Sequence, residues 1–144
     1  MRASLTRWLC LQMADVTVKR LEDFEAVFHG GFRRVRAGLG VSSMGIAVME
    51  LPPNFTEYPT HDQAHDRQEE VYTALSGRAT LNAGGEEHEL TPGIWARIGP
   101  GERRKITTAD EGARVLAVGA TPGEAYTPPE FTEDGAADPV GKHY

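Results

Sequence analysis

Closely spaced turn signals constrain this chain more than any other feature of its sequence. Between residues 43 and 120, short runs rich in Val, Ile, Tyr, Thr and Leu are separated by glycine or proline. The separating residues are Pro52-Pro53, Gly77, Gly84-Gly85, Pro92-Gly93, Gly99-Pro100-Gly101 and Gly112. β-branched and aromatic residues favour strands, and glycine and proline favour turns. Short strands at regular spacing are typical of an all-β sandwich or a small barrel, which is the fold class we expect.

The same signals predict the extent of each strand. The strands are expected at residues 32–37, 43–51, 70–77, 78–83, 86–90, 94–98, 103–109 and 113–120. Before them, Leu21, Phe24, Val27 and Phe28 recur at helical spacing between Lys19 and His29, which predicts a short helix, or one or two helical turns, ended by Gly30-Gly31. The basic run at residues 33–36 is interpreted as a solvated strand face.

The length of 144 residues is enough for one domain with a proper core. We expect a flexible N-terminal extension at residues 1–15, a barrel domain at 16–125, and an acidic, proline-containing tail at 126–144 that lies on the surface or is disordered. Met13 is a candidate natural start. The single cysteine, Cys10, excludes an intrachain disulfide and fits a cytoplasmic protein. A net charge of −6 argues against non-specific nucleic-acid binding, and no apolar run approaches the length of a membrane span.

A cluster of candidate ligands precedes the strand predicted at 70–77. His61, Gln63 and His65 occupy alternate positions, and Glu70 follows. Alternate residues of an extended chain point to one side, and imidazole and carboxylate groups suit iron, manganese, nickel or zinc. The amide of Gln63 is a poorer ligand and weakens such a site. The alternative is a solvated polar loop before a strand.

Two motifs resemble the small single-domain cupins. In the first, Glu70 is followed by six residues and then Gly77. In the second, the stretch "LTPGIWARIGPGERRK" carries Pro92-Gly93 and Pro100-Gly101. The resemblance implies a jelly-roll barrel, a metal ion held by three histidines and a glutamate, and a homodimer formed by pairing barrel edges.

The sequence departs from the family's metal ligands in two places. The family's His-x-His pair falls either on His61 and Gln63 or on Gln63 and His65, and the final histidine falls near Arg104. A guanidinium cation is not a metal ligand at ordinary pH. We therefore expect an altered, weak site for a divalent transition metal, with His61, Gln63, His65 and Glu70 as ligands.

Arg104 has three interpretations. It could pair with Glu70, hold a carboxylate or phosphate of a ligand, or lie on the surface beside Arg103 and Lys105. Trp95 is expected to pack in the core or in a dimer interface.

The predicted function is that of a small cupin that acts on or binds a small molecule at an altered metal site. If the protein is an enzyme, the resemblance implies a metal-dependent dioxygenase, isomerase or decarboxylase. Tyr72 lies two residues after Glu70 on the same strand face and is the candidate for proton transfer. The alternative is a metal-free cupin that binds a small ligand through Arg104, or a regulatory one, with no catalytic activity.

Overall fold

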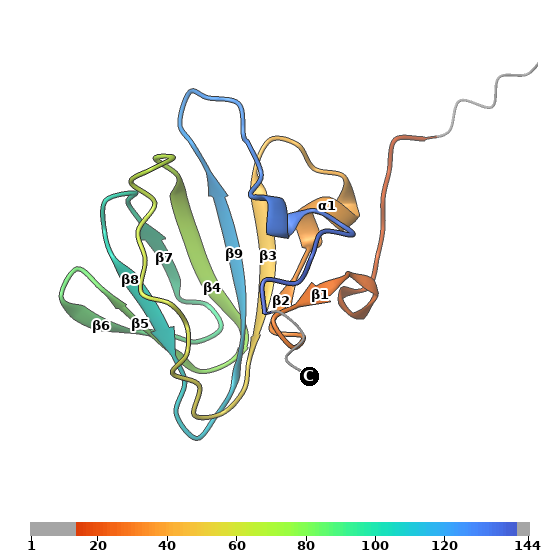
Figure 1. Cartoon of the computed structure of the whole chain (residues 1–144). Coiled ribbons are helices and arrows are strands. Elements are labelled where there is room, and N and C mark those ends of the chain that lie inside the picture. The colour runs from red at the N-terminus through yellow and green to blue at the C-terminus, as the bar shows by residue number, and fades with distance from the viewer. Residues whose placement is uncertain (1–13, 141–144) are drawn as a thin grey trace, which may run out of the picture.

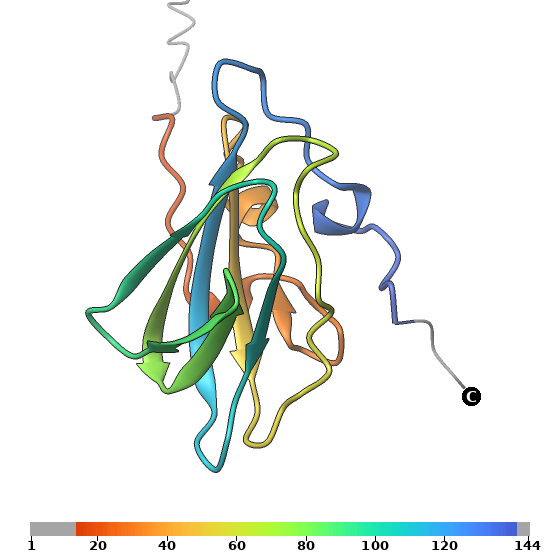
Figure 2. The same ribbon diagram turned by 90° about the vertical axis from the view of Figure 1, so that its left-hand side faces the viewer.

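The computed structural model describes residues 14–140 and consists mainly of two antiparallel β-sheets whose inner faces pack together (Figures 1 and 2). The larger sheet has the strand order β1-β2-β3-β9-β4-β7, and the smaller sheet has the order β6-β5-β8. The strands of the larger sheet are β1 (Ala26–Val27), β2 (Phe32–Arg33), β3 (Gly45–Leu51), β9 (Ala113–Ala120), β4 (Glu69–Gly77) and β7 (Trp95–Ile98). Those of the smaller sheet are β6 (Glu86–Leu90), β5 (Ala79–Ala83) and β8 (Arg104–Thr107). The prediction of an all-β double-sheet fold is confirmed.

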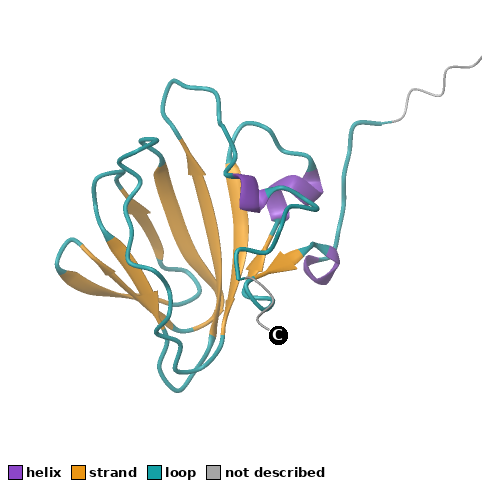
Figure 3. Cartoon of the chain, viewed as in Figure 1, coloured by secondary structure: helices purple, strands orange, loops and turns teal. Residues whose placement is uncertain are grey.

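Helices contribute little to this fold (Figure 3). They are the 3₁₀ turns η1 (Leu21–Asp23) and η2 (Glu130–Thr132) and the single short α-helix α1 (Val35–Leu39). Among residues 14–140, no helix has the length and apolar character needed to cross a membrane. The candidate start at Met13 and nearly all of the predicted extension at residues 1–15 lie outside the described residues.

The main core fills the space between the two sheets. Its largest fully buried apolar side chains are Tyr72, Leu81, Leu90, Ile106 and Val115. Along β5 and β8 the buried residues alternate with more exposed ones, as expected when one face of a sheet is buried. A smaller cluster of Phe24, Val35 and Val48 lies on the other face of β3, where α1 packs. The larger sheet is therefore covered on both faces at β3.

Gly77 explains why the first motif ends in glycine. Its backbone has a φ of +73°, in the left-handed region. A Cβ atom at this position would lie 2.0 Å from the carbonyl oxygen of Gly112. Any other residue would both strain the backbone and collide with the β8–β9 turn, so β4 can bend away here only with glycine.

The structure decides between the alternatives for the N-terminal part and corrects one strand. Of the short helix or the one or two turns predicted between Lys19 and His29, the structure has the single turn η1, followed by β1, because Phe24 and Val27 are buried by a turn and a strand instead of by one helical face. The strand predicted at 32–37 ends at Arg33, and α1 follows it until Gly40, whose φ of +77° ends the helix. Tertiary burial of Val35 overrides its local strand preference here.

The interpretation of residues 33–36 as a solvated strand face is also wrong for two of its three arginines. Arg34 and Arg36 are only 1% and 8% exposed. Besides Glu25 and the carbonyl group of Val41, their partners are in residues 126–140, which we call the C-terminal strap. Nε of Arg34 donates to the carbonyl of Phe131 at 2.8 Å, and Nη2 donates to that of Ala136 at 3.0 Å. The strap therefore lies on the surface but is fastened to α1 and β2, as Figure 1 shows.

Candidate functional site

Two rows of paired residues cross the inner face of the larger sheet near the start of β4. The first row is Gly45, Gly119, Glu70 and Ile98, and the second is Ala47, Ala117, Tyr72 and Ala96. Directly paired residues of antiparallel strands project to the same side of the sheet. Glu70 and Tyr72 therefore stand beside positions that carry no more than a methyl group on β3 and β9.

Glu70 is held by side chains from three different elements. Nε2 of Gln63 donates to its Oε1 at 3.0 Å, and the hydroxyl of Tyr72 donates to its Oε2. Nε of Arg104 lies 4.0 Å from Oε2. The Glu70 side chain is 15% exposed, so this carboxylate is mostly removed from water and neutralised by a neighbouring guanidinium.

Arg104 is the most deeply buried charged residue of this site, with 0% of its side chain exposed. A backbone bridge pairs it with His61, at 2.8 and 3.1 Å. Its Nη2 donates to the carbonyl of Gly99 at 3.2 Å, whereas Nε and Nη1 have no hydrogen-bond partner among the described residues. The surface interpretation of Arg104 is therefore wrong, and two of its buried N–H groups have no acceptor in the part of the chain that the structure describes.

The two predicted histidine ligands have different environments. His61 is half-buried, with Nδ1 3.0 Å from the carbonyl of Pro59, and its bridge to Arg104 puts both side chains on the same face. The His65 side chain is 75% exposed and lies 3.4 Å from Asp66. Of the four predicted ligands, the structure brings Gln63 and Glu70 into contact, places His61 beside Arg104, and leaves His65 in solvent.

The donor set around Glu70 does not fit a transition metal. The group that accompanies the carboxylate is a cation, and the other two partners are an amide and a phenol. Metal sites of this kind need several imidazole or carboxylate ligands. Within residues 14–140, no three His, Cys, Asp or Glu side chains gather in a way that could hold a metal ion.

Two tyrosines next to Glu70 keep their protons at neutral pH. Burial is the main reason that the pKa of Tyr58 is raised to about 12. The pKa of Tyr72 is also raised, first by burial and then by Tyr58 and Glu70. Both hydroxyl groups are therefore neutral hydrogen-bond donors. Sequence reasoning did not identify Tyr58, since its loop position before His61 follows no motif or periodicity.

Tyr126 is a second residue that sequence reasoning missed. It lies at the start of the C-terminal strap, and its hydroxyl is 2.8 Å from where a Cβ atom on Gly45 would stand. Gly45 begins the first row of the inner face. No local signal distinguished Tyr126 from the polar, proline-rich sequence around it.

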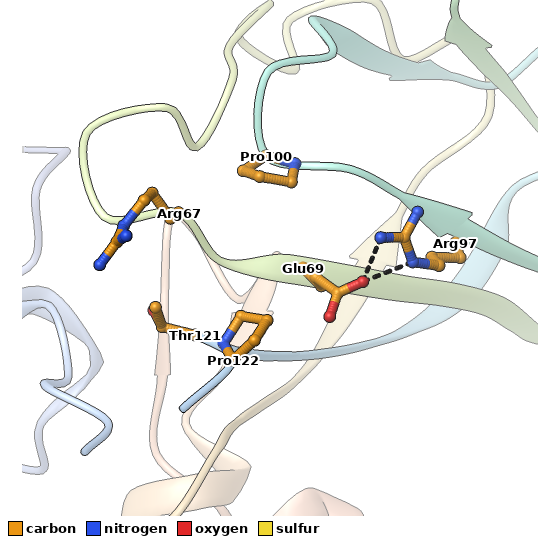
Figure 4. A pocket seen from close by; sticks show the side chains of 6 residues that line it. All are labelled: Arg67, Glu69, Arg97, Pro100, Thr121 and Pro122. Atoms are coloured by element: carbon orange, nitrogen blue, oxygen red, sulfur yellow. Dashed lines mark hydrogen bonds and ion pairs between the residues drawn. The ribbon is translucent and has the colours of Figure 1, made fainter. Parts of the chain in front are cut away.

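An open pocket of about 370 Å³ lies next to this region but on the other face of β4 (Figure 4). Its lining residues are Arg67, Glu69, Arg97, Pro100, Thr121 and Pro122. Glu69 and Arg97 pair with each other across it. Because adjacent strand residues point to opposite faces, Glu69 faces this pocket while Glu70 faces the barrel interior. The pocket is therefore separate from the Glu70–Arg104 site.

Comparisons with known proteins agree on the fold. The family model described as "Cupin domain" matches residues 47–119, about half of the chain. A cupin protein from Bacteroides fragilis is 25% identical with a TM-score of 0.63, and the match covers 87% of this chain and 98% of that one. No curated protein matches the sequence.

Two further solved structures share the fold alone. A sugar phosphate isomerase from a cupin superfamily, from Silicibacter pomeroyi, is 20% identical with a TM-score of 0.61 over 78% of this chain and 77% of that one. The polyketide cyclase RemF from Streptomyces resistomycificus is 22% identical with a TM-score of 0.59 over 72% and 78%. The different activities in these names mean that the fold does not identify a reaction.

Proposed function

The chain belongs to the cupin family, and from this premise we propose that its barrel binds a small organic acid without a metal ion. One observation supports the proposal above all: the buried guanidinium of Arg104 lies 4.0 Å from Glu70, at the position where the family resemblance puts the last histidine ligand. A positive side chain thus stands next to the carboxylate that a metal ion would otherwise neutralise. The altered, weak metal site predicted from the sequence is the competing hypothesis.

The chemistry of Arg104 favours an acidic ligand. Buried N–H groups nearly always have an acceptor, and Nε and Nη1 of Arg104 find none among residues 14–140. A carboxylate can accept two parallel hydrogen bonds from a guanidinium, which gives both affinity and orientation. The neutral hydroxyl of Tyr58 adds a further donor nearby. In this proposal Tyr72 holds Glu70 in place and transfers no proton.

Access to the site depends on the loop before β4. Arg104 has no exposed side-chain surface, and Gln63 covers the carboxylate of Glu70 by hydrogen bonding to it. We therefore expect the acid to enter when the segment carrying His61 and Gln63 moves, and to associate more slowly than diffusion allows.

The first prediction concerns Arg104 and the content of the purified protein. Protein prepared without chelators or a histidine tag should release an organic acid on denaturation and contain far less than one transition metal ion per chain. Arg104→Met should weaken retention of the acid about 100-fold, because it removes charge-assisted hydrogen bonds from a buried site. Mass spectrometry of the released compounds and elemental analysis measure the two quantities.

Arg103→Met is the matched control, because Arg103 is exposed. This variant should retain the acid as the natural chain does. One metal ion per chain that disappears in His61→Ala would refute the proposal and support the weak metal site instead. Acid retention that survives Arg104→Met would remove Arg104 from the binding site.

A second prediction concerns the homodimer, which we propose forms at the β7 edge of the larger sheet. β7 pairs with β4 on one side, and its other edge has no partner strand within residues 14–140. Trp95 on it is 65% exposed, with Ile94 at 41% and Leu75 at 48% close by. Exposed apolar groups at a free edge favour association. Trp95→Lys should convert the dimer to a monomer in sedimentation experiments. Met44→Lys, which changes an exposed apolar residue elsewhere, should leave the dimer intact; a monomeric natural protein would contradict the proposal.

A further inference from the structure

We propose that residues 14–20, which we call the N-terminal arm, pair as an added strand with the free edge of β7 in a second copy of this chain. This inference rests on the homodimer proposed above and is independent of acid binding. It names the segment that occupies the β7 edge. The exchange is reciprocal, because each copy carries one arm and one free edge.

The N-terminal arm has the composition of a strand but no strand partner in the described part of its own copy. Figure 1 shows it running away from the sheets, and all of its residues are exposed. Val16 and Val18 are 73% and 88% exposed, and residues 14–19 make no backbone hydrogen bond to any other described residue. β-branched residues favour strands, and alternate residues of an extended chain point to one side. The two valines therefore form an apolar side of the arm that nothing in its own copy covers.

The free edge of β7 matches this arm better than the other sheet edges do. One side of β7 pairs with β4, and on the other side no described strand follows. Trp95 and Ile94 are 65% and 41% exposed at this edge. By contrast, β1 has two residues, β6 carries three exposed glutamates, and the segment with His61 bridges to β8. Charged or covered edges resist the addition of a strand, so β7 is the edge that invites it.

The outer face of the larger sheet extends the apolar match. Val48, Leu116, Thr73 and Trp95 form one row of paired residues across β3, β9, β4 and β7. The hydroxyl of Thr73 donates to the carbonyl of Ile94 at 2.8 Å, so it needs no partner from outside. The cluster next to α1 covers the Val48 end of the row, whereas the Trp95 end is exposed. A strand added at β7 would place the two valines of the arm beside Trp95 and continue the row.

The arm is too short to fill this edge in its own copy. It joins the body at Leu21, which packs against the cluster on the outer face of β3. A strand added beside β7 would lie four inter-strand spacings from β3, about 19 Å. The arm spans about 23 Å when fully extended, so about 4 Å would remain for pairing along a strand about 13 Å long. Figure 1 shows the arm and β7 on opposite sides of the larger sheet. A second copy is therefore the occupant that can place an arm along β7.

The first test removes the apolar side of the arm in the full chain. Val16→Asp together with Val18→Asp should raise the dimer dissociation constant about 100-fold in sedimentation experiments, because four buried valines are lost per dimer. The circular dichroism spectrum should not change, since both valines are exposed in the single copy. Ser42→Asp together with Ser43→Asp is the matched control, because it adds the same charge at two exposed residues outside the arm. This control should dimerise as the natural chain does.

The second test mixes the arm variant with Trp95→Lys. In a dimer of either variant alone, both contacts between arm and edge are damaged. In the mixed dimer, the natural arm of the Trp95→Lys copy meets the natural β7 edge of the arm variant, so one of the two contacts is intact. The mixed dimer should therefore have a dissociation constant about tenfold above that of the natural dimer and about tenfold below that of either variant alone.

Three outcomes would overturn the inference. An arm variant that dimerises as tightly as the natural chain would leave direct pairing of two β7 edges as the homodimer contact. An arm variant that dissociates and is not rescued by mixing would mean that the arm acts within its own copy. A monomeric natural chain would remove the homodimer and this inference together, while acid binding at Arg104 would still stand.

Discussion

A chain carrying both Gln63→His and Arg104→His is expected to bind one divalent transition metal ion, whereas the natural chain is expected to retain almost none. The double change would put three imidazoles, with His61, beside the carboxylate of Glu70, which is the donor set that the family resemblance implies. The structure supports this geometry, because His61 and Arg104 are bridged and Gln63 already lies 3.0 Å from Glu70. Elemental analysis and zinc titration should show a rise from about 0.1 to about one ion per chain.

One single variant, and two further substitutions made in the double variant, serve as controls. Gln63→His alone should bind metal poorly, because the charge of Arg104 remains 4.0 Å from Glu70 and opposes a second cation. In the double variant, His61→Ala should abolish binding. His65→Ala should have no effect, since the His65 side chain is 75% exposed. If His65→Ala caused the double variant to lose its metal ion, the histidine pair of the site would be residues 63 and 65 instead of residues 61 and 63.

Arg34→Met is expected to lower the free energy of unfolding by about 3 kcal/mol and to release the C-terminal strap. The guanidinium is fully buried and satisfies the carbonyls of Phe131 and Ala136 together with the carboxylate of Glu25. Glu25 is 42% exposed and can be rehydrated. Most of the decrease in the free energy of unfolding therefore comes from the two carbonyl groups that lose their donor and from the lost packing. Urea unfolding measures the first effect, and limited proteolysis within residues 126–140 measures the second.

Arg114→Met is the matched control for this prediction. Arg114 also pairs with a glutamate, Glu50, at 2.9 Å, but its side chain is 45% exposed. Surface ion pairs contribute little to stability, so Arg114→Met should lower the free energy of unfolding by less than about 1 kcal/mol. The strap should stay protected from proteolysis in this variant. If Arg34→Met and Arg114→Met lowered the free energy of unfolding by the same small amount, Arg34 would not hold the strap.

The glycine and proline spacing was enough to predict the barrel strands. The strand predicted at 113–120 and that predicted at 86–90 match β9 and β6 at both ends. β9 is mostly apolar, whereas β6 is mostly polar and is recognised by the turns at Gly84-Gly85 and Pro92-Gly93 that bound it. In both cases local signals and tertiary packing agree. The N-terminal part was predicted less well, because Phe24 and Val27 fit a helix by spacing but are buried by a turn and a strand.

The candidate site was predicted only in part. Glu70, Tyr72 and Gln63 were expected to lie together, and the structure brings them into contact. The sequence left two ways to place the histidine pair, and in the structure His61 is half-buried whereas His65 is 75% exposed. Acid binding at this site stays a prediction.

The sequence by itself determined the all-β fold and the position of β4, because strand propensity and turn signals depend on neighbours in the chain. The need for glycine at residue 77 depends also on the carbonyl group of Gly112, which the tertiary structure brings against it. The tertiary structure alone decided which arginines are buried. Arg34, Arg36 and Arg104 lie in basic runs that look solvated, yet all three are buried. The reason is physical: a buried guanidinium is stable only with acceptors or a counter-charge. For Arg34 and Arg36 these include strap residues about a hundred positions away, besides Glu25 and the carbonyl group of Val41. For Arg104 they include Glu70 on another sheet.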